Sequence, residues 1–231
     1  MCGRLNIIDD PFVRSLLIEL GVESPLENVH WGRFKRATDT LSVVREFDGK
    51  RQLEQANWWL LQERTENGFK PSKYTSFNTR YDKLNTPRSA GYKAYRESRC
   101  VIPVKGFGET EFINKKPLHY YDFTTEDGQA MVLGGLVRQW FHPQTQQSIS
   151  SCSVITLPPH EKLKHIHSKA MPLILPQHDN TIDMWLDSSL TNTQVFDDLL
   201  KPHLPQSLIA TQIDKPSTYH AISQPIVINA D

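Results

Sequence analysis

Two stretches rich in strand-forming residues constrain the fold most, because each carries an aspartate–glycine pair near its middle. Residues 40–61 read TLSVVREFDGKRQLEQANWWLL with Asp48-Gly49, and residues 118–141 read LHYYDFTTEDGQAMVLGGLVRQWF with Asp127-Gly128. Aspartate followed by glycine favours the tight turns that join antiparallel strands, since these turns need positive φ angles. The sequence therefore predicts two β-hairpins, one around each pair.

The remaining pattern indicates further strands and a few helices at the ends of the chain. Strands are expected at residues 99–107 and 148–157, and a polar loop at residues 63–76. A helix is expected at residues 10–20, with Asp10 as N-cap, Pro11 in the first turn and Gly21 just past the end. The apolar face of this helix would carry Phe12, Leu16, Leu17 and Leu20. Two further short helices are expected at residues 181–189, capped by Thr181, and at residues 192–203.

We therefore expect an α+β fold in which residues 1–231 form a single domain. A chain of 231 residues is long enough to bury a substantial core. Because strands dominate the middle and helices the ends, the expected architecture is a curved, mostly antiparallel sheet with a barrel-like core and peripheral helices.

The charge balance limits how the chain could hold a nucleic acid. It has 26 basic and 26 acidic residues. A protein held on nucleic acid by electrostatics alone is usually basic, so such a role here would need a local patch or a covalent bond.

The sequence has no signal-peptide pattern and no apolar run of about 20 residues, so we expect a cytoplasmic protein without a membrane partner.

Cys2 is the most unusual of the three cysteines, because it follows Met1 directly. The others, Cys100 and Cys152, are widely spaced, which argues against a disulfide framework or a zinc site. If Met1 is removed, Cys2 carries a free α-amine beside its thiol. An amine with a pKa near 7.7–8.0 is partly neutral at pH 7 and can attack an aldehyde to give a Schiff base, which the thiol can close into a thiazolidine ring. The alternative is a chance cysteine in a frayed terminus.

Three other segments carry candidate chemistry, each with a structural alternative. Asn78 and Arg80 would share one face of a strand and suit a sugar-phosphate or a carbonyl, unless that face is merely solvated. Glu109 follows Gly106-Phe107-Gly108, where partial desolvation would raise its pKa and suit it to general acid–base work, unless it lies in an exposed turn.

Histidines gather at residues 160–167. Alternation would place His165 and His167 on one face of an extended segment, and one imidazole acting as a proton shuttle is more economical than a metal site that lacks further ligands. No metal and no cofactor is therefore expected, and surface histidines are the alternative.

Aromatic and basic residues complete the candidates for a nucleic-acid surface. Trp58 or Trp59 could stack on a nucleobase, although most such aromatics belong to the core. Arg33 is one of several basic side chains available for phosphate contacts, together with Lys35, Arg36, Arg80, Lys83 and Arg88.

The order of these motifs resembles one family over essentially the whole chain. The motifs are Cys2-Gly3-Arg4, then FNTR at 77–80, RCVIPVKGFGE at 99–109 and HIHSKAMPLIL at 165–175. They resemble the SRAP family, whose members are called SOS-response-associated peptidases or abasic-site processing proteins.

The resemblance implies a sensor that shields abasic sites in single-stranded DNA, with Cys2 bonded covalently to the sugar aldehyde after Met1 is removed. Asn78, Glu109 and His167 match the family's other catalytic positions, and Arg4 and Arg80 match its phosphate-binding arginines. Strand-cleaving lyase chemistry and autocatalytic removal of Met1 are further implied activities. The expected form is a monomer, associated with the nucleoid when it is bound to damaged DNA.

The chain departs from the family pattern at positions that bear on DNA affinity. Gly108 and Thr110 replace aromatic residues, Lys105 replaces an acid, Trp59 replaces a glycine, and Ala170 stands at the position of an arginine before Met-Pro.

Two other classes of function stay open from the residues alone. One is an N-terminal-nucleophile hydrolase that uses Cys2 on peptides or amides. The other is a non-covalent single-strand-binding module in which Cys2 is incidental.

Overall fold

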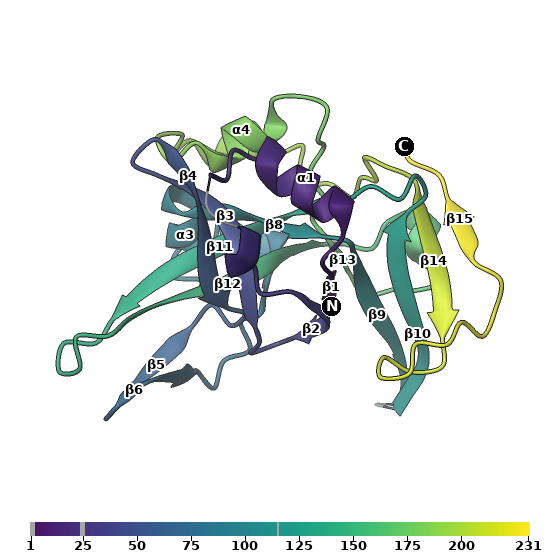
Figure 1. The fold of residues 1–231 in the computed structure, drawn as a ribbon, viewed down its shortest axis with the longest axis horizontal. Helices are drawn as coiled ribbons and strands as arrows, with labels where there is room; N and C mark the ends of the chain where they lie inside the picture. Colours follow the sequence, from purple (N-terminus) through teal and green to yellow (C-terminus); the bar gives the residue numbers. More distant parts are fainter. Residues whose placement is uncertain (1–2, 24–25, 115) are drawn as a thin grey trace.

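The computed structural model describes residues 3–23, 26–114 and 116–231, and Figure 1 shows two large β-sheets with short helices around them. The first sheet has the order β11 (Met131–Phe141), β8 (Arg99–Val104), β3 (Thr40–Phe47), β4 (Lys50–Asn57) and β12 (Ser148–Leu157). Because β11 also pairs with β12, these five strands close into a barrel. Two short strands, β7 (Asn78–Arg80) and β13 (Met171–Pro172), attach to β12.

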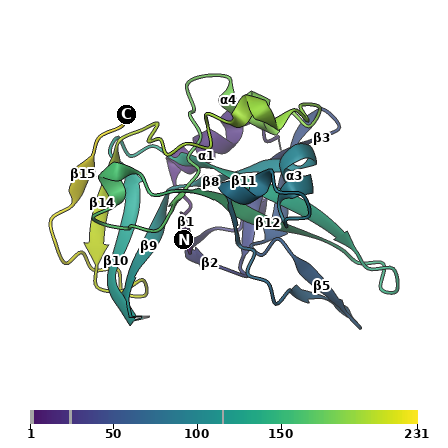
Figure 2. The same cartoon turned by 180° about the vertical axis from the view of Figure 1, so that it is seen from behind.

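The second sheet lies beside the barrel (Figures 1 and 2). Its order is β15 (Ile226–Ile228), β14 (Leu208–Ile213), β10 (Lys116–Thr125), β9 (Gly106–Ile113), β1 (Arg4–Ile7) and β2 (Gly32–Arg36). The helical segments are α1 (Pro11–Glu19), η1 (Leu26–Asn28), α2 (Tyr81–Leu84), α3 (Tyr92–Glu97), η2 (Glu161–Leu163), α4 (Thr181–Leu186) and η3 (Thr193–Phe196). The predicted α+β class, with a barrel-like core and peripheral helices, is confirmed.

Helix α1 begins and ends as the sequence predicts. Asp10 accepts a hydrogen bond from the Phe12 N–H, and Gly21 takes a φ of +76° just past the helix. The Val22 N–H then donates to the Leu17 carbonyl, which closes a Schellman motif. The predicted face is wrong at one position: Phe12 is 41% exposed, and Val13 is buried in its place.

The first predicted hairpin is confirmed. Strand β3 pairs with β4 up to Phe47 and Lys50, and both turn residues, Asp48 and Gly49, have positive φ. The expected loop at residues 63–76 is wrong, because β5 (Gln62–Thr65) and β6 (Gly68–Pro71) form an additional hairpin there that was not predicted. The Asn67-Gly68 pair is a hairpin signal that this expectation overlooked.

The second predicted hairpin is wrong, although both of its strands form. Strand β10 pairs with β9 and β14, whereas β11 pairs with β8 and β12, so the two strands belong to different sheets. Gly128 does turn the chain, with a φ of +75°. A turn signal fixes only the local reversal of the chain, while the burial of each strand's apolar face selects its neighbours.

The two short helices expected near the C-terminus are shorter than predicted. The first is α4, with Asn180 rather than Thr181 at its N-cap, and the second is the single turn η3.

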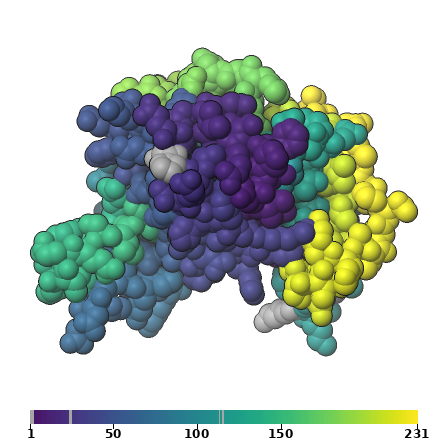
Figure 3. Space-filling model, in the orientation of Figure 1, coloured from purple at the N-terminus to yellow at the C-terminus, as the bar shows by residue number. Residues whose placement is uncertain are grey.

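The molecule is concave on its lower face. Figure 3 shows projections on both sides: the end of the β11–β12 pair with the β5–β6 hairpin on one, and the ends of β9 and β10 on the other. Within the described residues, no helix has the length and apolar character needed to cross a bilayer.

Gly106 provides a test of how the two sheets are joined. It begins β9 where the chain leaves the barrel strand β8, and a Cβ there would lie 2.2 Å from the Phe123 carbonyl oxygen. Because that oxygen belongs to the backbone of β10, we expect Gly106→Ala to lower the free energy of unfolding by about 3 kcal/mol.

The matched control for this substitution is Gly128→Ala. Nothing lies within 4 Å of a Cβ there, and only the positive φ opposes a side chain, so a loss of about 1 kcal/mol is expected. Urea unfolding followed by tryptophan fluorescence compares the two variants. Equal losses would contradict the steric explanation.

Candidate functional site

Glu109 and His167 form a buried pair at the centre of the candidate site. Glu109 lies on β9, opposite Tyr121 of β10, and His167 follows the single turn η2. The imidazole Nε2 lies 3.3 Å from a carboxylate oxygen of Glu109, and the two side chains are only 5% and 3% exposed. The structure thus brings together two catalytic candidates that are 58 positions apart (167 − 109) in the sequence.

Burial sets the protonation of this pair. Desolvation raises the pKa of Glu109 to about 7, and it lowers the pKa of His167 to about 4, where Lys169 adds a further electrostatic effect in the same direction. At neutral pH the imidazole is therefore uncharged, and Glu109 is close to its titration midpoint. A carboxyl in this condition can both give and take a proton, as general acid–base chemistry requires.

Arg4 supports the backbone on both sides of Glu109. Its guanidinium donates to the Glu109 carbonyl at 2.9 Å and to the Tyr121 carbonyl at 3.1 Å, so it fixes the two strands at the level of Glu109. The same group lies over the rings of Phe34 and Tyr120, at 5.3 and 5.7 Å. Arg4 is only 6% exposed, and its contact with phosphate stays a prediction.

The departure at Gly108 has a structural reason. A Cβ at this position would lie 2.7 Å from the Arg4 guanidinium carbon, so the side chain of Arg4 occupies the space above the strand. Lys105, another departure in this segment, is bonded elsewhere, because its ammonium pairs with Asp10 and donates to the Gly128 carbonyl.

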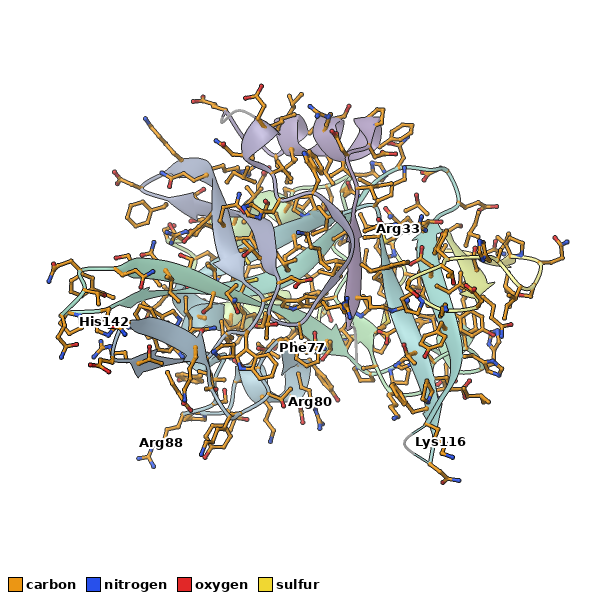
Figure 4. The ribbon with its side chains drawn as sticks, turned by 60° about the horizontal axis from the view of Figure 1, so that its bottom comes forward. Arg33, Phe77, Arg80, Arg88, Lys116 and His142 are labelled. Atoms are coloured by element: carbon orange, nitrogen blue, oxygen red, sulfur yellow. The ribbon has the colours of Figure 1, made fainter. Side chains whose placement is uncertain are left out.

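Asn78 and Arg80 lie on β7, a three-residue strand parallel to β12. The alternation expected from the sequence is present, because Thr79 between them is buried and bonds to Ser153, while Asn78 is half-buried and Arg80 is exposed. Arg80 forms a two-point ion pair with Asp82 at 2.9–3.0 Å. Figure 4, which brings the lower face forward, places Arg80 on the barrel side and Lys116 at the end of the second sheet.

A cavity of about 360 Å³ connects β7 with the segment that carries His167. Arg80 and Tyr81 line one side, and Lys169 and Ala170 line another. Lys169, two positions after His167, thus brings a cation to this cavity next to Ala170, which replaces the family's arginine. Sequence reasoning missed Lys169, although its position within the HSKAMP segment was a usable signal.

The aromatic candidates differ in their accessibility. Trp58 is completely buried, and its ring N–H donates to the Phe77 carbonyl, so the prediction that it stacks on a nucleobase is wrong. Trp59 is half-buried, donates to the Ser72 carbonyl, and has its ring 5.8 Å from that of Phe77. Figure 4 shows Phe77 near the middle of the lower face. An aromatic pair therefore remains available in Trp59 and Phe77.

Arg33 lies on β2, at the edge of the second sheet. Its guanidinium stacks on the Tyr219 ring and lies 3.9 Å from the buried carboxylate of Asp122, which also accepts from the Tyr219 hydroxyl. The side chain is 38% exposed, so one face stays open to a ligand. The cluster of Asp122 and Tyr219 was not found by sequence reasoning, because 97 positions separate the two residues.

Two other expectations concern the histidines and the cysteines. His165 is exposed whereas Ile166 and His167 are both buried, so the alternation expected for 165–167 is wrong, because the segment is a turn and not a strand.

Cys100 and Cys152 are fully buried, and burial raises the pKa of each thiol. Cys2 lies outside the described residues. Among the residues that the structure does describe, no group of three or more His, Cys, Asp or Glu side chains is arranged to hold a metal.

Relatives of this chain are found by sequence. The chain is 25% identical over 219 residues to abasic site processing protein YoaM of Bacillus subtilis (strain 168), which covers 92% of this chain and 91% of the relative. It is 30% identical over 173 residues to abasic site processing protein HMCES of Xenopus tropicalis, over 66% of this chain and 47% of that protein.

Solved structures show the same fold. Crystal structures of proteins from Bordetella bronchiseptica and Bacteroides thetaiotaomicron superpose with TM-scores of 0.69 and 0.72, each at 18% identity and over 93% of this chain. They cover 100% and 93% of the respective structures. Residues 1–216 match the family model described as SOS response associated peptidase (SRAP). The chain therefore belongs to the SRAP family.

Proposed function

We propose that this chain processes abasic sites in single-stranded DNA, and that it does so by a covalent thiazolidine link through Cys2 after Met1 is removed. The observation that carries the proposal is the buried Glu109–His167 pair, in a family whose two sequence relatives above are both named abasic site processing proteins. Residues 1–231 would act as one monomeric domain in the cytoplasm, recruited to the nucleoid by damaged DNA.

The register of β1 supports a reaction centre beside Glu109. Asn6, Leu5 and Arg4 lie opposite Gly106, Phe107 and Gly108 in turn. Followed back toward the N-terminus, β1 thus advances along β9 toward Glu109. Cys2 is joined to this end of β1 through Gly3. The other two thiols are buried in the core, which leaves Cys2 as the thiol for the reaction.

The proposed chemistry forms two bonds to the aldehyde carbon and releases one water. The α-amine of Cys2 adds to the carbonyl of the ring-opened sugar and gives a carbinolamine. Glu109 in its acid form protonates the departing hydroxyl, and an imine results. The thiol then adds to the imine carbon while its proton moves to the nitrogen, which closes the thiazolidine ring. His167, uncharged at neutral pH, relays protons to and from the sugar oxygen.

Binding of the strand needs only a modest basic surface, because the covalent bond supplies residence. Arg80 and Lys169 line the cavity next to the His167 segment, and Lys116 lies on the opposite side of the concave face. Trp59 and Phe77 offer an aromatic pair for a nucleobase. These positions agree with a protein whose net charge is zero.

The role of Cys2 is tested by the intact mass of the protein before and after incubation with an abasic oligonucleotide. The wild type should lose Met1 and gain the mass of the strand less one water, without borohydride. Cys2→Ala should give no adduct. Cys2→Ser keeps the amine but lacks the thiol, so its adduct should hydrolyse on heating. Turnover of an unrelated peptide by the wild type, without an adduct, would instead favour a hydrolase.

Glu109 is tested by the pH dependence of adduct formation. Its pKa of about 7 means that the acid form is lost as the pH rises through neutrality, while the α-amine becomes reactive as the pH approaches 8. The wild type should therefore show a bell-shaped rate profile. Glu109→Gln should lose the falling limb and react about 10²-fold more slowly, with strand affinity little changed.

Glu111→Gln, two positions along the same strand, is the control for Glu109 and should keep the wild-type profile. Equal losses of rate and affinity in Glu109→Gln would contradict a role in proton transfer.

Arg80 and Arg4 are expected to act on different steps. Arg80→Ala should weaken binding to a strand that carries an aldehyde-free tetrahydrofuran analogue. The slope of the logarithm of the binding constant against the logarithm of the salt concentration should become about 0.7 smaller, as for one phosphate contact on a single strand.

Arg4→Lys keeps the charge but loses the paired donation to the Glu109 and Tyr121 carbonyls. It should slow adduct formation and leave the salt dependence unchanged. Titrations at four salt concentrations distinguish the two; a reduced salt slope in Arg4→Lys would contradict its assignment.

A further inference from the structure

Asp231 is the centre of a cluster of hydrogen bonds that joins three parts of the chain. Its carboxylate lies within 3.1 Å of ring nitrogens of both His160 and His203, and within 2.8 Å of the Lys162 ammonium. It also accepts from the Leu204 N–H at 2.9 Å. All of these groups are donors or cations, so the carboxylate is the common acceptor that keeps them together.

The segment that carries Asp231 is itself anchored to the second sheet. Strand β15 pairs with β14 at the outer edge of that sheet (Figures 1 and 2). Beyond it, the Ala230 N–H donates to the Ser207 hydroxyl at 3.1 Å, and the Asp231 N–H donates to the Leu204 carbonyl at 3.1 Å. Asp231 is therefore held from the side of the sheet, and it holds residues 160–162 in turn.

A short series of contacts leads from this cluster to His167. The Lys162 ammonium, besides its bond to Asp231, donates to the carbonyls of Asn229 and Ala230 at 3.1 and 2.9 Å. His160 caps η2 by accepting from the Lys162 N–H at 3.2 Å. The Leu163 carbonyl at the end of η2 accepts the His167 N–H at 2.8 Å. The turn between residues 160 and 167 is thus fixed at one end by Asp231 and at the other by the backbone of His167.

We infer that Asp231 is a positioning residue for His167, acting through Lys162, His160 and the turn η2. The inference rests on the proposed function, since it concerns the alignment of His167 with Glu109 during adduct formation. The family model matches residues 1–216, so Asp231 lies outside the matched region and its role is not supplied by membership of the family.

The substitution Asp231→Asn tests this role, because it keeps the size of the side chain and removes its charge and one acceptor oxygen. We expect the single-turnover rate of adduct formation with an abasic single strand to fall about tenfold, since small errors in the placement of a catalytic group are costly. Affinity for the tetrahydrofuran strand should stay within about twofold. Lys162→Met, which removes the cation from the other side of the cluster, should give the same division between rate and affinity.

A control and a double mutant separate positioning from general destabilisation. Asp198→Asn breaks a comparable pair, with Lys201, on an exposed surface, and should leave the rate unchanged. In a Glu109→Gln background, Asp231→Asn should cause little further loss, because the carboxyl with which His167 must be aligned is already absent.

The outcomes are distinguishable. A wild type that forms no adduct overturns the proposed function and this inference with it. With a reactive wild type, unchanged rates in Asp231→Asn and Lys162→Met overturn the inference alone. Equal losses of rate and affinity, or a full additional loss in the Glu109→Gln background, also overturn it, because they indicate a structural role without coupling to the pair.

Discussion

The burial of a carboxyl beside an imidazole, with almost no contact with water, is the constraint on which the rest of the site depends. An ionised Glu109 is costly in this environment, so its pKa rises toward neutrality and the His167 ring stays uncharged. Arg4 offsets only part of this cost, because its guanidinium donates to backbone carbonyls at Glu109 and Tyr121. Glu109 can therefore exchange a proton near pH 7, while the His167 imidazole beside it stays uncharged.

The two sheets divide the work of building this pair. Strand β8 belongs to the barrel, and the chain passes through Lys105 and Gly106 into β9, which carries Glu109 in the second sheet. His167 comes from the segment after the barrel strand β12, and η2 in that segment is bonded to Asp231 beyond β15. The geometry of the Glu109–His167 pair thus depends on how the two sheets meet. Substitutions far from the pair, such as at Asp231, can therefore disturb it.

The main helix and the first hairpin followed from the sequence because short-range rules control them. Asp10, Pro11 and Gly21 specify the limits of α1, and Asp48-Gly49 specifies the first hairpin, since capping and positive φ depend only on neighbouring residues. The motif order also indicated the family, which the match over residues 1–216 bears out. By itself, the sequence therefore determined the main helix, the first hairpin, the fold class and the family.

Only the tertiary structure decided which strands pair and which side chains reach solvent. The predicted hairpin of β10 and β11 was wrong because the two strands pair in different sheets. The predicted base stacking of Trp58 was wrong because its ring is completely buried. Arg4 turned inward because carbonyls of β9 and β10 meet there, and Asp231 reaches Lys162 across 69 positions. Such contacts join residues far apart in the chain, and their energies depend on burial and alignment that no local pattern encodes.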